Sequence, residues 1–217
     1  MRAVIFDLDG TLLNCPYDFP AMREAVLALA AGYGLEREVL TGIGILEAIE
    51  RGARLLPAET GRRFRTDAET AVFALEREGA KRSAPLPGAG DVLVWLKDNA
   101  YKVGIITRNS GRIVRPILEN AGFPFDALLA REDVPRVKPD PVHIEDMLAL
   151  LGVGPRDAIM VGDHIWDIAC AKAAGLANIG ITSGSSTKDA LARAGADAIL
   201  ENISRLPFWL RENFALP

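Results

Sequence analysis

Two kinds of hydrophobic pattern alternate along the second half of the chain: short continuous apolar runs, and longer segments with apolar residues at helical spacing. Short runs at residues 101–107, 157–163 and 177–182 are rich in Val and Ile and bounded by turn residues, which predicts buried strands. Between them, residues 88–100, 110–122, 141–153 and 167–175 carry apolar side chains at helical spacing. A weaker strand and helix follow at 196–210. Strands that alternate with helices predict βαβ units and a parallel sheet covered on both faces.

The predicted helices carry signals for their ends. Gly122, Gly152 and Gly175 each follow an apolar periodic segment, where glycine favours the left-handed conformation that closes a helix. Pro116 lies within the helix predicted at 110–122, and an interior proline costs roughly 3 kcal/mol. We therefore expect that helix either to start late or to kink.

The first half of the chain is patterned differently. An apolar strand at the N-terminus runs into Asp7 and Asp9, and helical patterns then cover 18–34, 39–56 and 66–82 with no strand between them. We predict an α/β fold, a Rossmann-like doubly wound parallel sheet with an inserted all-helical domain. The expected boundaries are residues 1–14 and 85–217 for the α/β core and 15–84 for the insert.

Composition and charge argue against several classes of function and partner. The chain has 217 residues, a net charge of −4 and a pI near 5.3, which argues against a nucleic-acid-binding surface. It contains no apolar run of the roughly 20 residues that cross a bilayer, and its start does not resemble a secretory signal. Two cysteines are too few for a disulfide framework or a zinc site. We expect a cytoplasmic protein, a monomer or a homodimer, with no membrane or nucleic-acid partner.

Polar side chains gather where the predicted strands end. Ligands of open parallel sheets bind beyond the carboxyl ends of the strands. The residues placed there are Asp7, Asp9, Thr107, Asp163 and Asp167, with Lys138 in a nearby loop. Several carboxylates in one cleft require a cation, and a set of oxygen ligands favours Mg²⁺.

These residue types suit phosphoryl transfer. A carboxylate can attack phosphorus and form an aspartyl-phosphate, while a second carboxylate protonates the leaving alkoxide and later activates water. Thr107 and Lys138 offer a hydroxyl and a positive charge to the transferred group, and Gly10 with Thr11 suits a turn whose amides face an anion. Each residue alone is more often a helix cap, a turn former or a solvated side chain. Their conjunction favours catalysis.

Four segments also resemble the motifs of the haloacid-dehalogenase-like hydrolase superfamily: DLDGTLL, IITRNS, VKPDP and VGDHIWDIACAKAAG. The resemblance implies Asp7 as nucleophile, Asp9 as general acid/base, and Thr107 and Lys138 as phosphoryl-binding residues. It implies a Mg²⁺ site formed by Asp7, the carbonyl of Asp9 and Asp163, supported by Asp167. The helical insert is similar to the cap domain of the phosphoglycolate phosphatase and β-phosphoglucomutase branch.

The motifs depart from the family pattern at a few positions. The family commonly has Asn directly after the Thr of the second motif, whereas here Arg108 precedes Asn109. Both are therefore candidates for phosphate binding, together with Gly10, and which of the two faces the substrate stays open. His164 and Trp166 occupy positions where small polar residues are common, and His143 is expected to be structural or solvated.

The expected reaction is magnesium-dependent hydrolysis of a small phosphorylated metabolite, phosphoglycolate-like. In the insert, Arg54, Arg62 and Arg63 are candidates to bind a carboxylate or second phosphate of the substrate, or else form a solvated arginine face. A sugar-phosphate mutase and a non-catalytic binding protein are the alternatives. A dehalogenase is disfavoured by Asp9, and a phosphonate hydrolase by the lack of any insert lysine except Lys81.

Overall fold

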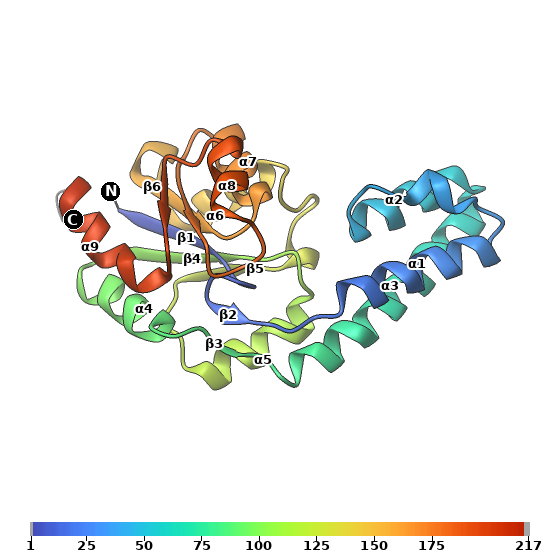
Figure 1. Ribbon diagram of the computed structural model, residues 1–217, viewed down its shortest axis with the longest axis horizontal. Helices are drawn as coiled ribbons and strands as arrows, with labels where there is room; N and C mark the ends of the chain where they lie inside the picture. The colour runs from blue at the N-terminus through green and yellow to red at the C-terminus, as the bar shows by residue number, and fades with distance from the viewer. Residues whose placement is uncertain (1, 215–217) are drawn as a thin grey trace. The chain divides into compact units, whose positions relative to one another are not determined.

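The computed structural model describes residues 2–214 and divides into two compact units. Pro16–Arg82 forms a helical unit, and the segments that end at Cys15 and begin at Ser83 form an α/β unit. Figure 1 shows the elements of both units. Among the helices within residues 2–214, none is both long enough and apolar enough to cross a membrane.

A parallel sheet forms the centre of the α/β unit. Within residues 2–214 six strands pair in the order β5-β4-β1-β6-β7-β8. Val4 of β1 lies beside Val103 of β4 and Ile159 of β6, and all residues of β1 and β6 are buried. Strands buried on both faces are continuous apolar runs, as the sequence predicts. The strands are β1 (Ala3–Asp7), β4 (Lys102–Ile106), β5 (Ala127–Leu129), β6 (Ala158–Gly162), β7 (Ala177–Ile181) and β8 (Ala198–Leu200).

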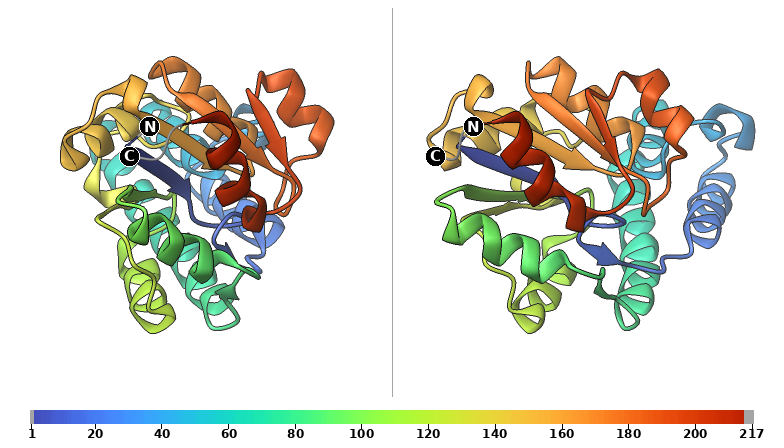
Figure 2. Two further views of the ribbon diagram at one scale, coloured as in Figure 1. Left: turned by 90° about the vertical axis from the view of Figure 1, so that its left-hand side faces the viewer. Right: turned by 60° about the vertical axis from the view of Figure 1, so that its left-hand side comes forward.

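Helices cover both faces of this sheet, which confirms the doubly wound α/β fold. Val4 and Phe6 of β1 belong to one apolar cluster with α4 and α5, while Ala3 and Ile5 point into a second cluster with α6 and α7. Figure 2 shows these two helical layers on opposite sides of the strands. The helices are α4 (Ala89–Asp98), α5 (Gly111–Ala121), α6 (Val142–Leu151), α7 (Ile165–Ala173), α8 (Lys188–Ala194) and α9 (Leu206–Asn213).

The helical unit has a core of its own. It contains α1 (Phe19–Gly32), a 3₁₀ turn at Arg37–Leu40, α2 (Ile45–Leu55) and α3 (Ala58–Ala80). Phe64 of α3 is fully buried, and its ring meets that of Tyr33 edge-on at 5.5 Å between centroids. A Cβ at Gly52 of α2 would lie 2.5 Å from the Phe64 ring, so glycine allows the two helices to approach closely.

Several local predictions are wrong. The segment 39–56 is not one helix, because Gly42 adopts a φ of +75° between the 3₁₀ turn and α2. The third helix of the insert begins at Ala58, eight residues before the predicted position 66. Of the two alternatives for the helix that contains Pro116, the late start is wrong, since α5 begins at Gly111, and the kink stays a prediction. The edge strand β5, the helix α8 and the short pair β2 (Leu13–Asn14) with β3 (Ala84–Pro85) were not predicted.

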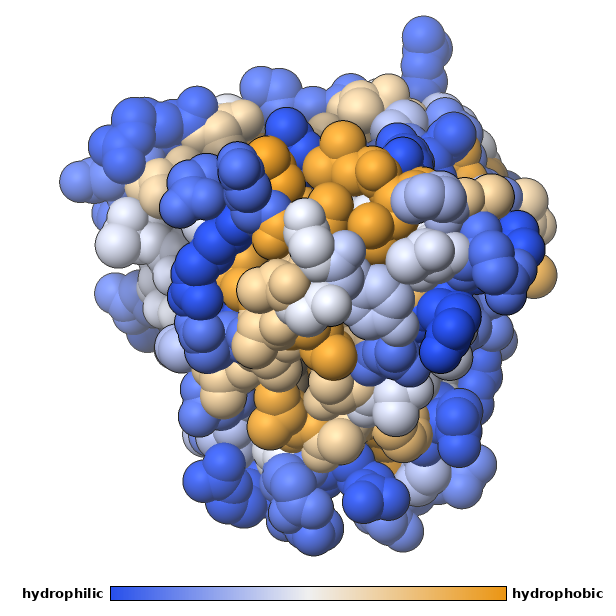
Figure 3. All heavy atoms as spheres, turned by 90° about the vertical axis from the view of Figure 1, so that its right-hand side faces the viewer, coloured by the Kyte–Doolittle hydropathy of each residue, from blue (hydrophilic) through white to orange (hydrophobic). Residues whose placement is uncertain are grey.

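Apolar side chains also reach the surface. On the face of the molecule drawn in Figure 3, polar residues surround an area of apolar ones. The large apolar side chains that are exposed include Phe19 and Leu55 in the helical unit and Val94, Leu150 and Phe208 in the α/β unit. They are spread over separate elements, and single exposed apolar residues are normal on soluble proteins.

Candidate active site

The first strand ends at the two acids that open the chain's first motif. Asp7 is the last residue of β1 and is only 7% exposed. The chain then turns, with the amides of Leu12 and Leu13 both donating to the carbonyl of Leu8, and Gly10 takes a φ of +88°. A Cβ on Gly10 would lie 2.6 Å from Oδ2 of Asp163. Glycine is therefore required there both by the backbone angle and by the close approach of Asp163.

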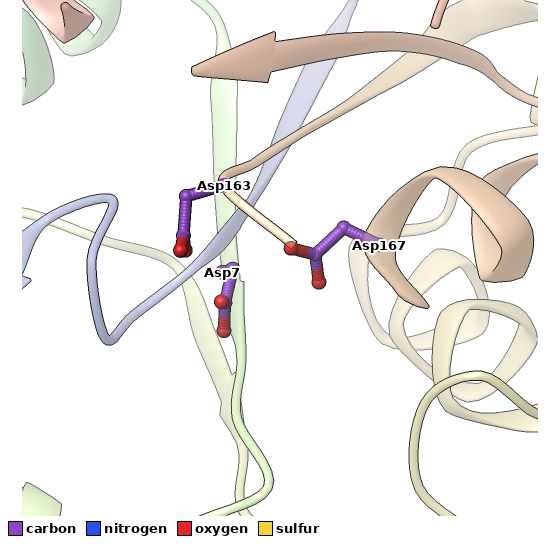
Figure 4. Close-up of side chains that lie close together, drawn as sticks. All are labelled: Asp7, Asp163 and Asp167. Carbon is purple, nitrogen blue, oxygen red and sulfur yellow. The ribbon is translucent and has the colours of Figure 1, made fainter. Parts of the chain in front are cut away.

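Three carboxylates form a buried cluster at this edge of the sheet. Oxygens of Asp7, Asp163 and Asp167 all lie within 4.8 Å of one another, and each side chain is buried. They come from the end of β1, the loop after β6 and the first turn of α7, and Figure 4 shows their carboxyl groups side by side. Burial, followed by the charge of Asp167, raises the pKa of Asp7 well above its ordinary value. The three carboxylates offer only oxygen ligands, and a cation bound between them would relieve the repulsion of their negative charges. The cluster therefore fits a hard divalent cation such as Mg²⁺.

Lys138 provides the positive charge beside this cluster. Its Nζ lies 2.6 Å from Oδ1 of Asp7 and 2.6 Å from Oδ1 of Asp167. Burial alone would lower the pKa of Lys138, but the charges of Asp167 and Asp7 raise it above the ordinary value. The amine is therefore held as a cation between two carboxylates.

Asp9 has different neighbours from Asp7. Its Oδ2 accepts hydrogen bonds from Oγ1 of Thr107 at 3.2 Å and Nδ2 of Asn109 at 2.7 Å. Burial raises the pKa of Asp9, while hydrogen bonds from Cys15 and Thr107 lower it. The environment of Asp9 is thus one of neutral donors, whereas Asp7 is paired directly with a cation.

Arg108 and Asn109, between which the sequence did not decide, point to different partners. Asn109 is buried and contacts Asp9, and its own amide donates to Oγ1 of Thr107 at 3.1 Å. Arg108 donates from Nη1 to the carbonyl oxygen of Lys138 and lies over the ring of Trp166.

Asp163 and Asp167 are each fixed by further hydrogen bonds. Asp163 accepts from the hydroxyl of Thr11 at 3.1 Å and from the amide and hydroxyl of Ser185 at 2.7 and 2.9 Å. Asp167 accepts from the amide of His164 at 2.9 Å, so it caps α7 as well as binding Lys138. Ser185 was missed by sequence reasoning because the loop after β7 carries no motif.

Of the two roles expected for His143, structural or solvated, the structure shows the first, but the sequence did not indicate its partners. It is fully buried on α6, where Nδ1 accepts from the amide of Lys138 at 3.2 Å and Nε2 lies 3.2 Å from the carbonyl oxygen of Leu129. Burial and the charge of Lys138 lower the pKa of His143 to about 4. The neutral ring therefore fixes the loop that carries Lys138. Its spacing of five residues after Lys138 is the only signal in the sequence.

The arginines proposed from the insert lie on exposed positions of the helical unit. Arg62 pairs with Glu59 on α3, Arg54 lies 3.9 Å from Glu50 on α2, and Arg63 is exposed on α3. Exposed pairs of this kind contribute about 0–1 kcal/mol. A role of these arginines in substrate binding stays a prediction.

Comparison with known proteins identifies the family. A family model described as haloacid dehalogenase-like hydrolase matches residues 1–175. The chain therefore belongs to the haloacid dehalogenase-like hydrolases, as its four motifs predict.

Individual relatives agree with this assignment. Over 94% of this chain and 78% of the relative, the sequence is 31% identical to phosphoglycolate phosphatase 1 of Pseudomonas aeruginosa. It is 29% identical to a plasmid-encoded phosphoglycolate phosphatase of Cupriavidus necator, over 94% of this chain and 91% of the relative. The crystal structure of a hydrolase from Pseudomonas syringae has the same fold, with a TM-score of 0.71 at 23% identity over 99% of this chain and 100% of that one.

Proposed function

We propose that this hydrolase is a magnesium-dependent phosphatase that cleaves a small phosphomonoester through an aspartyl-phosphate. The observation that carries the proposal is the contrast between the two acids at the end of β1. Asp7 lies 2.6 Å from the cationic Lys138, whereas Asp9 is bound by the neutral groups of Thr107 and Asn109. Two carboxylates whose environments differ in this way can take different roles in catalysis.

Asp7, Asp163 and Asp167, with the carbonyl of Asp9, would hold the metal ion. Carboxylate and carbonyl oxygens are the ligands that Mg²⁺ takes in proteins. When bound, the ion neutralises the like charges and polarises the phosphoryl oxygens.

In the first half-reaction the carboxylate of Asp7 attacks phosphorus and the bond from phosphorus to the ester oxygen breaks. Asp9 gives its proton to the departing alkoxide, and its raised pKa favours the protonated form that this step needs. Lys138, Thr107 and Asn109 stabilise the charge on the transferred group.

In the second half-reaction Asp9, now ionised, takes a proton from water. The water oxygen attacks the phosphorus of the aspartyl-phosphate, and the bond to Asp7 breaks, which restores the carboxylate and releases phosphate. The same acid thus serves as acid and then as base, so the protons balance over one turnover.

The substrate class is a small metabolite monoester such as phosphoglycolate. The names of the relatives support this choice, since both are phosphoglycolate phosphatases. The helical unit would serve as the cap domain that the family resemblance implies. A panel of phosphorylated metabolites identifies the preferred leaving group by the highest kcat/KM.

Hydrolysis of an aryl phosphate in Mg²⁺ tests the reaction. Asp7→Asn is expected to lower the rate by about a thousandfold or more, and Asp9→Asn by on the order of 10²–10⁴. Asp91→Asn, at an exposed position of α4, is the matched control and keeps wild-type activity. Full activity in Asp7→Asn would reject the proposal. A mutase would return the phosphoryl group to a sugar and release little phosphate.

A further inference from the structure

Arg108 joins three separate segments of the candidate site. It follows Thr107 at the end of β4, donates from Nη1 to the carbonyl oxygen of Lys138, and places its guanidinium carbon 4.2 Å from the centre of the Trp166 ring. Trp166 lies in the first turn of α7, directly before Asp167. The residue that follows Thr107 in the chain therefore contacts the segments that carry Lys138 and Asp167.

Trp166 is itself held in place. Its ring packs against that of His164 with 4.6 Å between centroids, and its amide donates to Nδ1 of His164 at 3.1 Å. The motifs depart from the family pattern at both Arg108 and Trp166, and these two residues contact each other. A guanidinium can stack on an indole and donate in its own plane at once, which an ammonium group cannot.

Hydrogen bonds hold the main chain of Lys138 at both its amide and its carbonyl group. Its amide donates to His143, and its carbonyl oxygen accepts from Arg108. Its amine lies at the end of a stem of four methylene groups, and the finite reach of this stem limits how far the main chain can move while Nζ keeps both carboxylate contacts. Both carboxylates that it contacts are 2.6 Å away, which leaves little room for displacement.

We propose that Arg108, stacked on Trp166, is a positioning residue that holds Lys138 in register with Asp7 and Asp167. The proposal rests on the function proposed above, because it concerns the cation that stabilises the transferred phosphoryl group. Asn109 takes the position beside Asp9, at 2.7 Å. The Arg108–Trp166 pair acts through Lys138 and determines turnover rather than the choice of substrate.

Steady-state kinetics on several phosphomonoesters test this role. Arg108→Met is expected to lower kcat by on the order of 10- to 100-fold for every substrate, because a misplaced catalytic group costs rate. KM should change by less than about twofold. Arg108→Lys should not restore kcat, whereas Trp166→Phe, which keeps an aromatic face, should retain more activity than Trp166→Leu. Arg115→Met is the control, since Arg115 is half-exposed and pairs with Asp133.

The double variant Arg108→Met/Trp166→Leu measures whether the two residues act as one. Its kcat should be no lower than that of Arg108→Met alone, because the same contact is lost in both. Losses that multiply, or a raised KM with unchanged kcat, would overturn the proposal and assign Arg108 to direct substrate binding.

Crystal structures of wild type and Arg108→Met separate this inference from the proposed function. Movement of Nζ of Lys138 by about 1 Å or more away from Asp7 or Asp167 supports the positioning role, even if the wild type releases no phosphate. In that case the proposed function alone fails. An unmoved Lys138 overturns the positioning role whatever the activity.

Discussion

Two sets of charged side chains, one in each unit of this protein, lie in opposite environments. In the α/β unit the side chains of Lys138, Asp7 and Asp167 are 3%, 11% and 1% exposed and contact one another. In the helical unit the pairs Arg62–Glu59 and Lys81–Glu78 are each more than half exposed. Buried charges are costly to desolvate, while exposed pairs contribute little to stability. The difference predicts which charged residues take part in the reaction.

Removing the buried cation should have the largest effect. Lys138→Met leaves Asp7 and Asp167 without their cation, and breaking a buried pair costs about 3–5 kcal/mol. Urea unfolding in the presence of a chelator measures this loss. Lys81→Met, which removes the exposed partner of Glu78, is the matched control and should change the free energy of unfolding by less than about 0.5 kcal/mol. Equal losses in the two variants would contradict the comparison.

Metal binding should stabilise the same cluster. At a Mg²⁺ concentration of about 100 times Kd, the free energy of unfolding is expected to rise by about 2.7 kcal/mol. Thermal unfolding with and without Mg²⁺ measures the gain. Asp163→Asn should reduce it strongly, and Asp189→Asn, on α8, should not. A gain that survives in Asp163→Asn would place the ion elsewhere.

His143 should make stability depend on pH. Its pKa in the fold is lowered to about 4, mainly by burial and then by Lys138, so the unfolded chain binds the proton more readily. Stability is therefore present above the unfolded pKa of about 6.5 and is lost as pH falls toward 4, by on the order of 2 kcal/mol between pH 7 and pH 5. Arg108 also lowers this pKa, while Asp133 raises it.

The variant His143→Asn tests the source of that loss. Asn can still accept from the amide of Lys138 but does not titrate, so the part of the pH dependence between 7 and 5 that His143 supplies should disappear. Urea unfolding of both proteins at the two pH values gives the difference. An unchanged slope in His143→Asn would assign the acid sensitivity to other groups.

The smallest effect is expected at the exposed pair of α3. Arg62→Ala removes the partner of Glu59 and should change the free energy of unfolding by less than about 0.5 kcal/mol. The measurement also informs the function of the helical unit. An increase in KM with unchanged stability would show that Arg62 contacts substrate.

The ease of predicting each element followed from its length and burial. β1, β4, β6 and β7 each have five residues, at least four of them buried, so their mostly apolar runs could be recognised in the sequence. β5 has three residues at the edge of the sheet and gave no such run. The break between the 3₁₀ turn and α2 depends on the backbone angle of Gly42, which the apolar pattern does not report.

By itself the sequence determined the α/β class, the family and the order of the polar residues at the strand ends, because these depend on local period and motif. Only the tertiary structure decided their partners. Asn109 rather than Arg108 lies beside Asp9, and His143 holds the amide of Lys138. Such contacts join residues from different strands and loops, and their geometry is set by how helices pack on the sheet, which no single segment encodes. The roles of these residues in a reaction stay predictions for the experiments above.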